Sequence, residues 1–254
     1  MLLRRITEHV KDQNWFAVFL DFFIVVVGVF MGIQVSNWND ARQEREQEAV
    51  ILESLRVDFH SLDETMQHGI RYHRRALTGL QAVIEATDAG DLAPDKREAF
   101  ENGLRFGMYF SATNKASGIL DEILASGRLS IVQDAELRKA LSEYQSFQTG
   151  VSANILGVAQ QSIPLMTPFT AQFRYDVTRD HFRADQSYER AFRYSAIGDY
   201  DVASMALDPA FIEAAEELYQ FQRIALQFEQ ATLNRIRNIL LRLGDDVRNG
   251  VELE

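Results

Sequence analysis

A single apolar run near the N-terminus constrains this chain more than any other feature. The run covers 21 residues, Trp15–Val35, and contains one charged residue, Asp21. About 20 apolar residues are needed to cross the hydrocarbon core of a bilayer, and a soluble helix is rarely apolar on every side for so long. We therefore expect a short cytoplasmic tail at residues 1–14 and a transmembrane helix at residues 15–37.

The exit of the run favours a retained anchor over a cleaved signal peptide. A signal peptide has a shorter apolar core and an Ala-x-Ala-like cleavage site, whereas residues 32–38 read Gly-Ile-Gln-Val-Ser-Asn-Trp. We interpret Trp15 and Trp38 as interfacial anchors. The cationic residues near the two ends are Arg4, Arg5 and Lys11 before the run and Arg42 and Arg45 after it. This excess before the run predicts a cytoplasmic N-terminus and a periplasmic domain, residues 38–254, at a bacterial inner membrane.

Asp21 lies well inside the run, about 9 Å of helical rise beyond Trp15. Ionisable residues within membrane spans usually mark a functional or protein contact. The carboxylate shares a helix stripe with a Gly-x-x-x-Gly spacing, which lets membrane helices pack closely. The sequence predicts that another membrane helix contacts the side that carries Asp21, Val25, Gly28, Gly32 and Gln34.

The end of the run carries the pattern Gln34-Val35-Ser36-Asn37-Trp38-Asn39-Asp40, followed by Arg42-Gln43-Glu44-Arg45-Glu46. A Ser-Gly break, a Leu and a Leu-Arg pair occur in the later stretch ILDEILASGRLSIVQDAELRKALSEY, residues 119–144. Together with Asp21, these features resemble an uncharacterised bacterial family of single-pass membrane proteins, a domain of unknown function. Members of that family often have Glu at the position of Asp21. The resemblance implies an anchor and a stalk, and it implies no activity.

Beyond the run, apolar residues recur at alternating steps of three and four from Leu52 to Val83. This heptad seam is interrupted at Gly69 and His73, and it predicts one nearly continuous helix from the run to about Thr87. Such a helix needs partner helices to cover its seam. We expect an all-α fold in which the transmembrane helix continues into a long amphipathic helix packed in an antiparallel extramembrane helical bundle.

The other expected helices follow from capping and proline signals. They cover residues 94–110, residues 119–126 with a stop at Gly127, Asp134 to about Leu165 with Pro164 and Pro168 ending it, and Pro209 to about Leu243. The core seam expected for the last helix consists of Phe211, Ala214, Leu218, Phe221, Ala225, Phe228 and Thr232. Residues 167–207 are less regular, with one helix expected at residues 187–194.

Two groups of side chains outside the run are candidates for binding. His60, Glu64 and His68 follow one ridge at steps of four and are weak candidates for metal ligands. We favour a solvated face, because all three lie off the seam and three ligands on one helix leave a site incomplete. Aromatic and arginine residues are typical of interfaces, but they could also cap the end of a bundle. This possible partner surface contains Phe169, Phe173, Arg174, Tyr175, Phe182, Tyr188, Phe192 and Tyr194.

Composition and motifs argue against several classes of function. The net charge of −11 makes a nucleic-acid binder a poor fit, and the lack of cysteine excludes thiolate chemistry. We found no nucleophile, phosphate-loop or dinucleotide motif and predict no enzyme, cofactor or small-molecule substrate. A sensor would need a signalling module that residues 1–14 are too short to provide.

Two hypotheses remain open. In the first, the chain is a structural or interaction subunit that contacts itself or other membrane proteins within the lipid bilayer. In the second, it is an ion-coupled accessory subunit, similar in plan to the single-span subunits of flagellar and TonB-linked stators, in which Asp21 would carry the proton.

Overall fold

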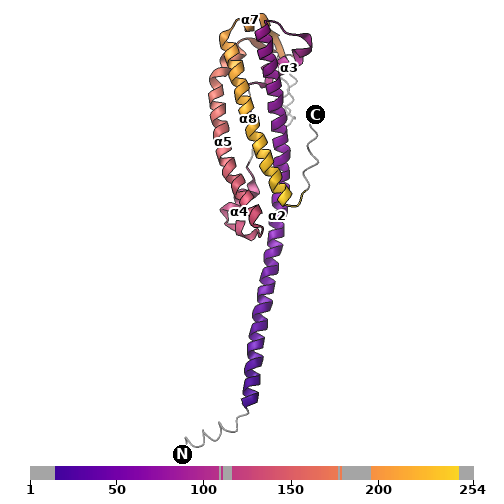
Figure 1. The fold of residues 1–254 in the computed structure, drawn as a ribbon, viewed down its shortest axis with the longest axis vertical. Helices are drawn as coiled ribbons and strands as arrows, with labels where there is room; N and C mark the ends of the chain where they lie inside the picture. The colour runs from indigo at the N-terminus through magenta and orange to yellow at the C-terminus, as the bar shows by residue number, and fades with distance from the viewer. Residues whose placement is uncertain (1–14, 109, 111–115, 177, 179–195, 246–254) are drawn as a thin grey trace, which may run out of the picture. The chain divides into compact units, whose positions relative to one another are not determined.

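The computed structural model describes residues 15–108, 110, 116–176, 178 and 196–245. The chain divides into two compact units, Met1–Leu52 and Glu53–Glu254, which we describe separately. Most of the described residues are helical, as predicted. Helix α2 extends over Trp15–Ala89 and contributes to both units, which confirms the prediction of one nearly continuous helix to about Thr87 (Figure 1).

The second unit contains seven further helical segments and two strands after α2 among the described residues. They are η1 (Pro94–Lys96), α3 (Arg97–Phe106), α4 (Gly118–Ala125), η2 (Arg128–Ile131), α5 (Ala135–Thr170), β1 (Phe173–Asp176), β2 (Ala196–Tyr200), α7 (Val202–Ala206) and α8 (Pro209–Arg242). Helices α5 and α8 lie side by side over much of their length (Figure 1).

Local signals explain why these helices begin and end where they do. The side chain of Asp134 accepts hydrogen bonds from the first turn of α5, and Asp208 does the same for α8, where Pro209 occupies the first helical position. Gly127 has a φ of 69°, a left-handed conformation that glycine adopts without strain, and it separates α4 from η2. These three boundaries agree with the sequence-based expectations.

Helix α5 does not end near Leu165, and this part of the prediction was wrong. Pro164 and Pro168 both lie inside α5, which continues to Thr170. A proline inside a helix removes one backbone hydrogen bond and disfavours the preceding turn. Burial of the last turn offsets this cost, because Phe169 is fully buried and its ring stacks on Phe211 with centroids 5.3 Å apart.

The expectation of an all-α fold is also corrected at one place. Strands β1 and β2 form an antiparallel pair in which Phe173 faces Tyr200 and Tyr175 faces Ile197. The side chains of Phe173 and Ile197 are buried, so one face of this small sheet packs on the helices. Burial of that face stabilises a pair that would be only marginally stable in isolation. The helix expected at residues 187–194 lies outside the described residues.

The predicted seam of α2 is buried within the second unit from Leu55 to Val83. The C-terminal part of this seam packs with α3, the two strands and α8 in one hydrophobic core. Leu80, Phe100 and Leu218 are fully buried in this core. Helices of the same chain therefore cover this seam. Residues later in α2 contact residues earlier in α8. Asp63 pairs with Arg237, and His73, ten residues further along α2, contacts Gln222, which precedes Arg237 in α8.

Candidate functional site

Between Phe19 and Val35, the described side chains of α2 are mostly apolar and exposed. Val25 is 62% exposed and Trp38 is 65% exposed, while Gly28, Gly32 and Gln34 are exposed as well. A Cβ atom built on Gly28 or Gly32 would meet no atom within 4 Å. The other exposed large apolar side chains are those of Phe19, Leu20, Phe22, Phe23, Ile24, Val26, Val29, Phe30, Met31, Ile33 and Val35.

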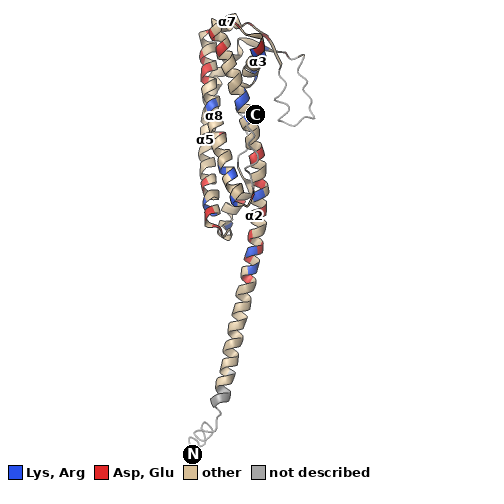
Figure 2. Cartoon of the chain, turned by 45° about the vertical axis from the view of Figure 1, so that its right-hand side comes forward, with Lys and Arg blue, Asp and Glu red and all other residues tan. Residues whose placement is uncertain are grey.

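This surface makes the N-terminal part of α2 a candidate membrane span by length and composition. In Figure 2 the described residues along it are tan up to the first blue and red bands, and the side chain of Asp21 is not among those described. None of the residues in this apolar stretch of 18 residues is buried, whereas the core helix of a soluble protein is mostly buried. The side chains of Asp21 and Trp15 lie outside the described part, so the predicted roles of both residues stay predictions.

The proposed aromatic partner surface is only partly accessible. Phe169 and Phe173 are buried in the core, where their rings meet edge to face at 5.8 Å, so these two residues cannot form a surface. Arg174 is exposed and Tyr175 is partly buried. The remaining members of the predicted set, Phe182, Tyr188, Phe192 and Tyr194, lie outside the described residues.

The ridge of possible metal ligands on α2 does not come together as a site. The Nε2 atom of His60 lies 2.8 Å from Oδ2 of Asp245, and His68 Nδ1 lies 2.9 Å from a guanidinium nitrogen of Arg71. Glu64 is exposed between them. Within the described ranges, no three His, Asp or Glu side chains are grouped so that they could hold a metal ion.

The interruption of the α2 seam contains a buried polar cluster that the sequence reasoning missed. We define the buried polar cluster as Gly69, His73, Gln222 and Glu229. His73 is 1% exposed and Glu229 is fully buried. The Nδ1 atom of His73 lies 2.5 Å from Gln222 Oε1, and Gln222 Nε2 donates a hydrogen bond to the carbonyl oxygen of Gly107 at 2.8 Å.

These contacts restrict the protonation of the His73 ring. Gln222 uses its amide nitrogen as a donor toward Gly107, so its oxygen accepts from His73, and Nδ1 must carry a hydrogen. The other ring nitrogen, Nε2, lies 3.6 Å from Oε1 of Glu229. This separation is longer than a hydrogen bond, so the contact is an ion pair only when the ring is protonated.

Gly69 makes room for the carboxylate of this cluster. A Cβ atom at this position would lie 2.2 Å from Oε2 of Glu229 and 2.7 Å from its carboxyl carbon. Such distances are far below van der Waals contact, so Gly69 allows the carboxylate to lie against the α2 backbone. The cluster is fully enclosed and has the properties of a structural polar contact between α2 and α8.

Another buried polar group lies between α2 and α5. The ring of Tyr144 packs edge-on against Phe59, with centroids 5.1 Å apart, and both residues are fully buried. Burial raises the pKa of the Tyr144 phenol above its ordinary value, and a hydrogen bond with Gln148 opposes this shift. The raised pKa means that the folded state favours the neutral phenol.

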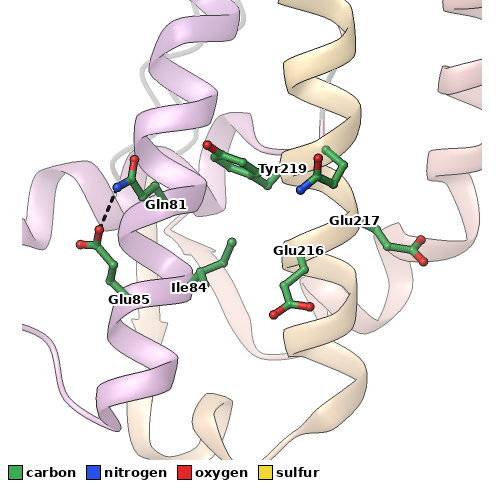
Figure 3. Close-up of a pocket in the computed structure, with 7 residues that line it drawn as sticks. Gln81, Ile84, Glu85, Glu216, Glu217 and Tyr219 are labelled. Atoms are coloured by element: carbon green, nitrogen blue, oxygen red, sulfur yellow. Dashed lines mark hydrogen bonds between the residues drawn. The ribbon is translucent and has the colours of Figure 1, made fainter.

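A groove lies between α2 and α8 among the described residues (Figure 3). Its volume is about 570 Å³, and carboxylates from both helices line it. Glu85 already accepts a hydrogen bond from Gln81 at 2.9 Å and lies 3.8 Å from Lys96 Nζ. The lining residues are Gln81, Ile84, Glu85, Glu216, Glu217, Tyr219 and Gln220. Since the carboxylates are exposed, the groove has the properties of solvated surface.

Comparison of the chain with models of known families, with curated proteins and with solved structures finds no match.

Proposed function

We propose that this chain is a single-pass protein of a bacterial inner membrane that acts as a structural or interaction subunit, in contact with copies of itself or with other membrane proteins. The observation that carries the proposal is the exposed apolar surface of α2 around Val25, Gly28 and Gly32. Exposing so many large apolar side chains to water would be very unfavourable, whereas lipid tails and a second helix cover them well.

In this proposal, the stripe of Asp21, Val25, Gly28 and Gly32 faces a partner helix. The absence of contacts at the two glycines supports close approach of another backbone. Trp38 provides an interfacial anchor at the far end of the span. A carboxylate within a span is costly unless a protein or water contact receives it, so the same face would also accommodate Asp21.

The domain that follows the span would be an antiparallel helical bundle on the periplasmic side. The opposite order of the α2 and α8 contacts, Asp63 with Arg237 and His73 with Gln222, supports this arrangement. The excess of Arg and Lys before the span supports the orientation.

The chain lacks cysteine, so single cysteines test this proposal cleanly. Glu217→Cys, at an exposed position of α8, should react with a membrane-impermeant maleimide in cells with a permeabilised outer membrane and an intact inner membrane. Labelling only after lysis of the inner membrane would refute the orientation. Val25→Cys should form cross-links with another protein or copy in native membranes, and Phe23→Cys, on the opposite side of the helix, should not.

The ion-coupling hypothesis is separated from this proposal by Asp21→Asn. Loss of a proton or ion flux with normal cross-linking of Val25→Cys would favour ion coupling. Unchanged flux together with altered cross-linking would favour a contact role for the carboxylate.

A further inference from the structure

A long section of the chain lacks charge in a way that membrane insertion does not explain. The 30 residues from Tyr144 to Phe173 contain no Asp, Glu, Lys or Arg, although charged residues make up 25% of the whole chain. Almost all of this section belongs to α5, in the second unit. Solvent-facing sides of helices in globular domains normally carry charged residues. Burial explains the lack of charge on the inner side of this helix, but the lack of charge on its outer side needs a separate explanation.

Helix α5 has two stripes with heptad spacing. The inner stripe is buried or partly buried and consists of Leu137, Leu141, Tyr144, Gln148, Val151, Ile155, Val158, Ser162, Leu165 and Phe169. We define the outer stripe as Ser142, Ser146, Thr149, Ala153, Leu156, Gln160, Ile163 and Thr167, all of which are exposed. The two stripes are five residues out of phase, about 140° around the helix at 3.6 residues per turn. The outer stripe therefore lies on a side of α5 that no other described part of the chain covers.

The outer stripe is suited to packing against another helix. Its steps of four and three continue for more than three heptads, which is the pattern of a helix-pairing seam. At its centre Leu156 is 59% exposed, and Ile163, two turns further on, is 60% exposed. Gly150 and Gly157 flank the stripe, and a Cβ atom on either would meet nothing within 4 Å. A second backbone could thus approach closely beside the two apolar side chains.

Three of the four hydroxyl groups of the outer stripe can be covered at little cost. The hydroxyls of Ser142 and Ser146 donate to the carbonyl oxygens of Arg138 and Ser142 at 3.0 Å. Thr149 donates in the same way to the carbonyl oxygen of Gln145 at 3.1 Å. Because these donors have partners within α5, removing water from them leaves no hydrogen unpaired. The stripe is polar in composition and yet tolerates burial.

We propose that the outer stripe of α5 is a self-association surface, occupied by α5 of a second copy of this chain. Charge identifies the occupant. A copy also has a net charge of −11, so two copies repel each other on most surfaces and can meet only where identical residues bring no like charges together. In a two-fold interface the same patch faces itself, and the outer stripe meets that condition over its full length.

The inference deepens the proposed function, because it assigns one contact surface of the interaction subunit and relies on the anchor. Anchoring two copies in one membrane raises their effective concentration, so a stripe with modest apolar area can pair. In solution the same surface would associate weakly. Pairing of two copies would also cover the two large apolar side chains of the stripe, which are exposed in a single chain.

The test uses full-length single-cysteine variants in native membranes, since the chain has no other cysteine. Leu156→Cys and Ala153→Cys should give a disulfide-linked dimer under mild oxidation. Asn154→Cys is the matched control, because it is exposed on the same helix but points about 160° away from Leu156. Equal dimer formation at positions 156 and 154, or no dimer at position 156, would overturn the inference. Cross-linking of Leu156→Cys to a different protein would also overturn it.

A second variant tests the charge argument. Ile163→Asp, added to Leu156→Cys, places like charges across the two-fold interface and should lower dimer formation about tenfold or more. Position 163 is exposed in the single chain, so the helical content should not change. Cross-linking that is unaffected by Ile163→Asp would contradict pairing through the outer stripe. If Val25→Cys cross-links normally while Leu156→Cys does not, the proposed function stands and only this inference fails.

Discussion

The close approach of α2 and α3 at Gly79 gives the most direct test of the fold. A Cβ atom on Gly79 would lie 2.3 Å from the backbone nitrogen of Gly103 and 2.5 Å from its Cα atom. Optimal contact between such atoms is about 3.5–4.0 Å, so the two helices would have to separate by about 1 Å or more. The obstructing atoms belong to the backbone, and no side-chain rotation can relieve the contact. Fully buried Leu80 and Leu104 pack beside it.

We expect Gly79→Ala to destabilise the second unit by about 2 kcal/mol. Overpacking with backbone movement lowers the free energy of unfolding by about 3 kcal/mol at the upper end of its range. The better helix propensity of alanine offsets about 1 kcal/mol of this loss. For a unit of this size, the midpoint of thermal unfolding should fall by about 4–8 °C, measured by circular dichroism of the detergent-solubilised chain.

The matched control for this prediction is Gly150→Ala. Gly150 also lies inside a long helix, but a Cβ atom there would meet nothing within 4 Å. Only the propensity gain applies, so the unfolding midpoint should rise by about 2–4 °C. If Gly79→Ala raised the midpoint as Gly150→Ala does, the described packing of α2 against α3 would be wrong.

Three further predictions concern buried or capping polar groups. Glu229→Ala should cost about 3–5 kcal/mol in urea unfolding because it removes one partner of a buried pair, while Glu217→Ala, at an exposed position, should change stability by less than about 0.5 kcal/mol. Tyr144→Phe should reduce the loss of stability at alkaline pH. The raised pKa of the folded phenol gives stability that is present below pH 10 and decreases as the unfolded phenol ionises above it, so a pH series of unfolding midpoints checks the sign. Asp208→Ala should cost about 1 kcal/mol and speed hydrogen exchange in the first turn of α8.

The helices were predictable because their signals are local. The N-cap aspartates of α5 and α8, the left-handed glycine after α4 and the heptad spacing of α2 all act within a few residues. The continuation of α5 through Pro164 and Pro168 was not predictable in this way. It depends on the stacking of Phe169 on Phe211, a contact between residues 42 positions apart in the chain.

The core face of α8 shows how a correct period can still give the wrong residues. Steps of three and four through Leu218 fit either the expected Phe221 and Phe228 or their neighbours. In the structure Gln222 and Glu229 are fully buried, and both phenylalanines are only partly buried. We expected the phenylalanines in the core because they are apolar. The polar residue His73 in the α2 seam requires polar partners on α8, and Gln222 and Glu229 provide them. The sequence contained part of that signal, since Gly69 and His73 interrupt the apolar seam of α2.

The buried polar cluster offers a reason why α2 and α8 pair in one register. Heptad seams can slide by seven residues with little change in apolar contact, unless a buried polar residue fixes the alignment. A slide of one heptad would move Glu229 from Gly69 to Leu62 or Ala76, where neither a glycine nor the imidazole of His73 receives the carboxylate. Such a buried, unpaired charge would be strongly unfavourable. The observed register is therefore the one that satisfies this cluster.

We expect that replacing the buried polar cluster by apolar residues would preserve the free energy of unfolding and weaken the preference for one register of α2 against α8. The triple variant His73→Leu, Gln222→Leu and Glu229→Ala leaves no buried charge and should unfold within about 2 kcal/mol of the natural chain, because apolar replacement of a buried pair is often neutral. Its register can be read from cysteines that replace Asp63 and Arg237, joined by a thiol-specific cross-linker, because Nε of Arg237 lies 2.8 Å from Oδ1 of Asp63 across α2 and α8. The pair should cross-link readily in the otherwise natural chain and incompletely in the triple variant. Equal cross-linking in both would show that the apolar packing alone fixes the register.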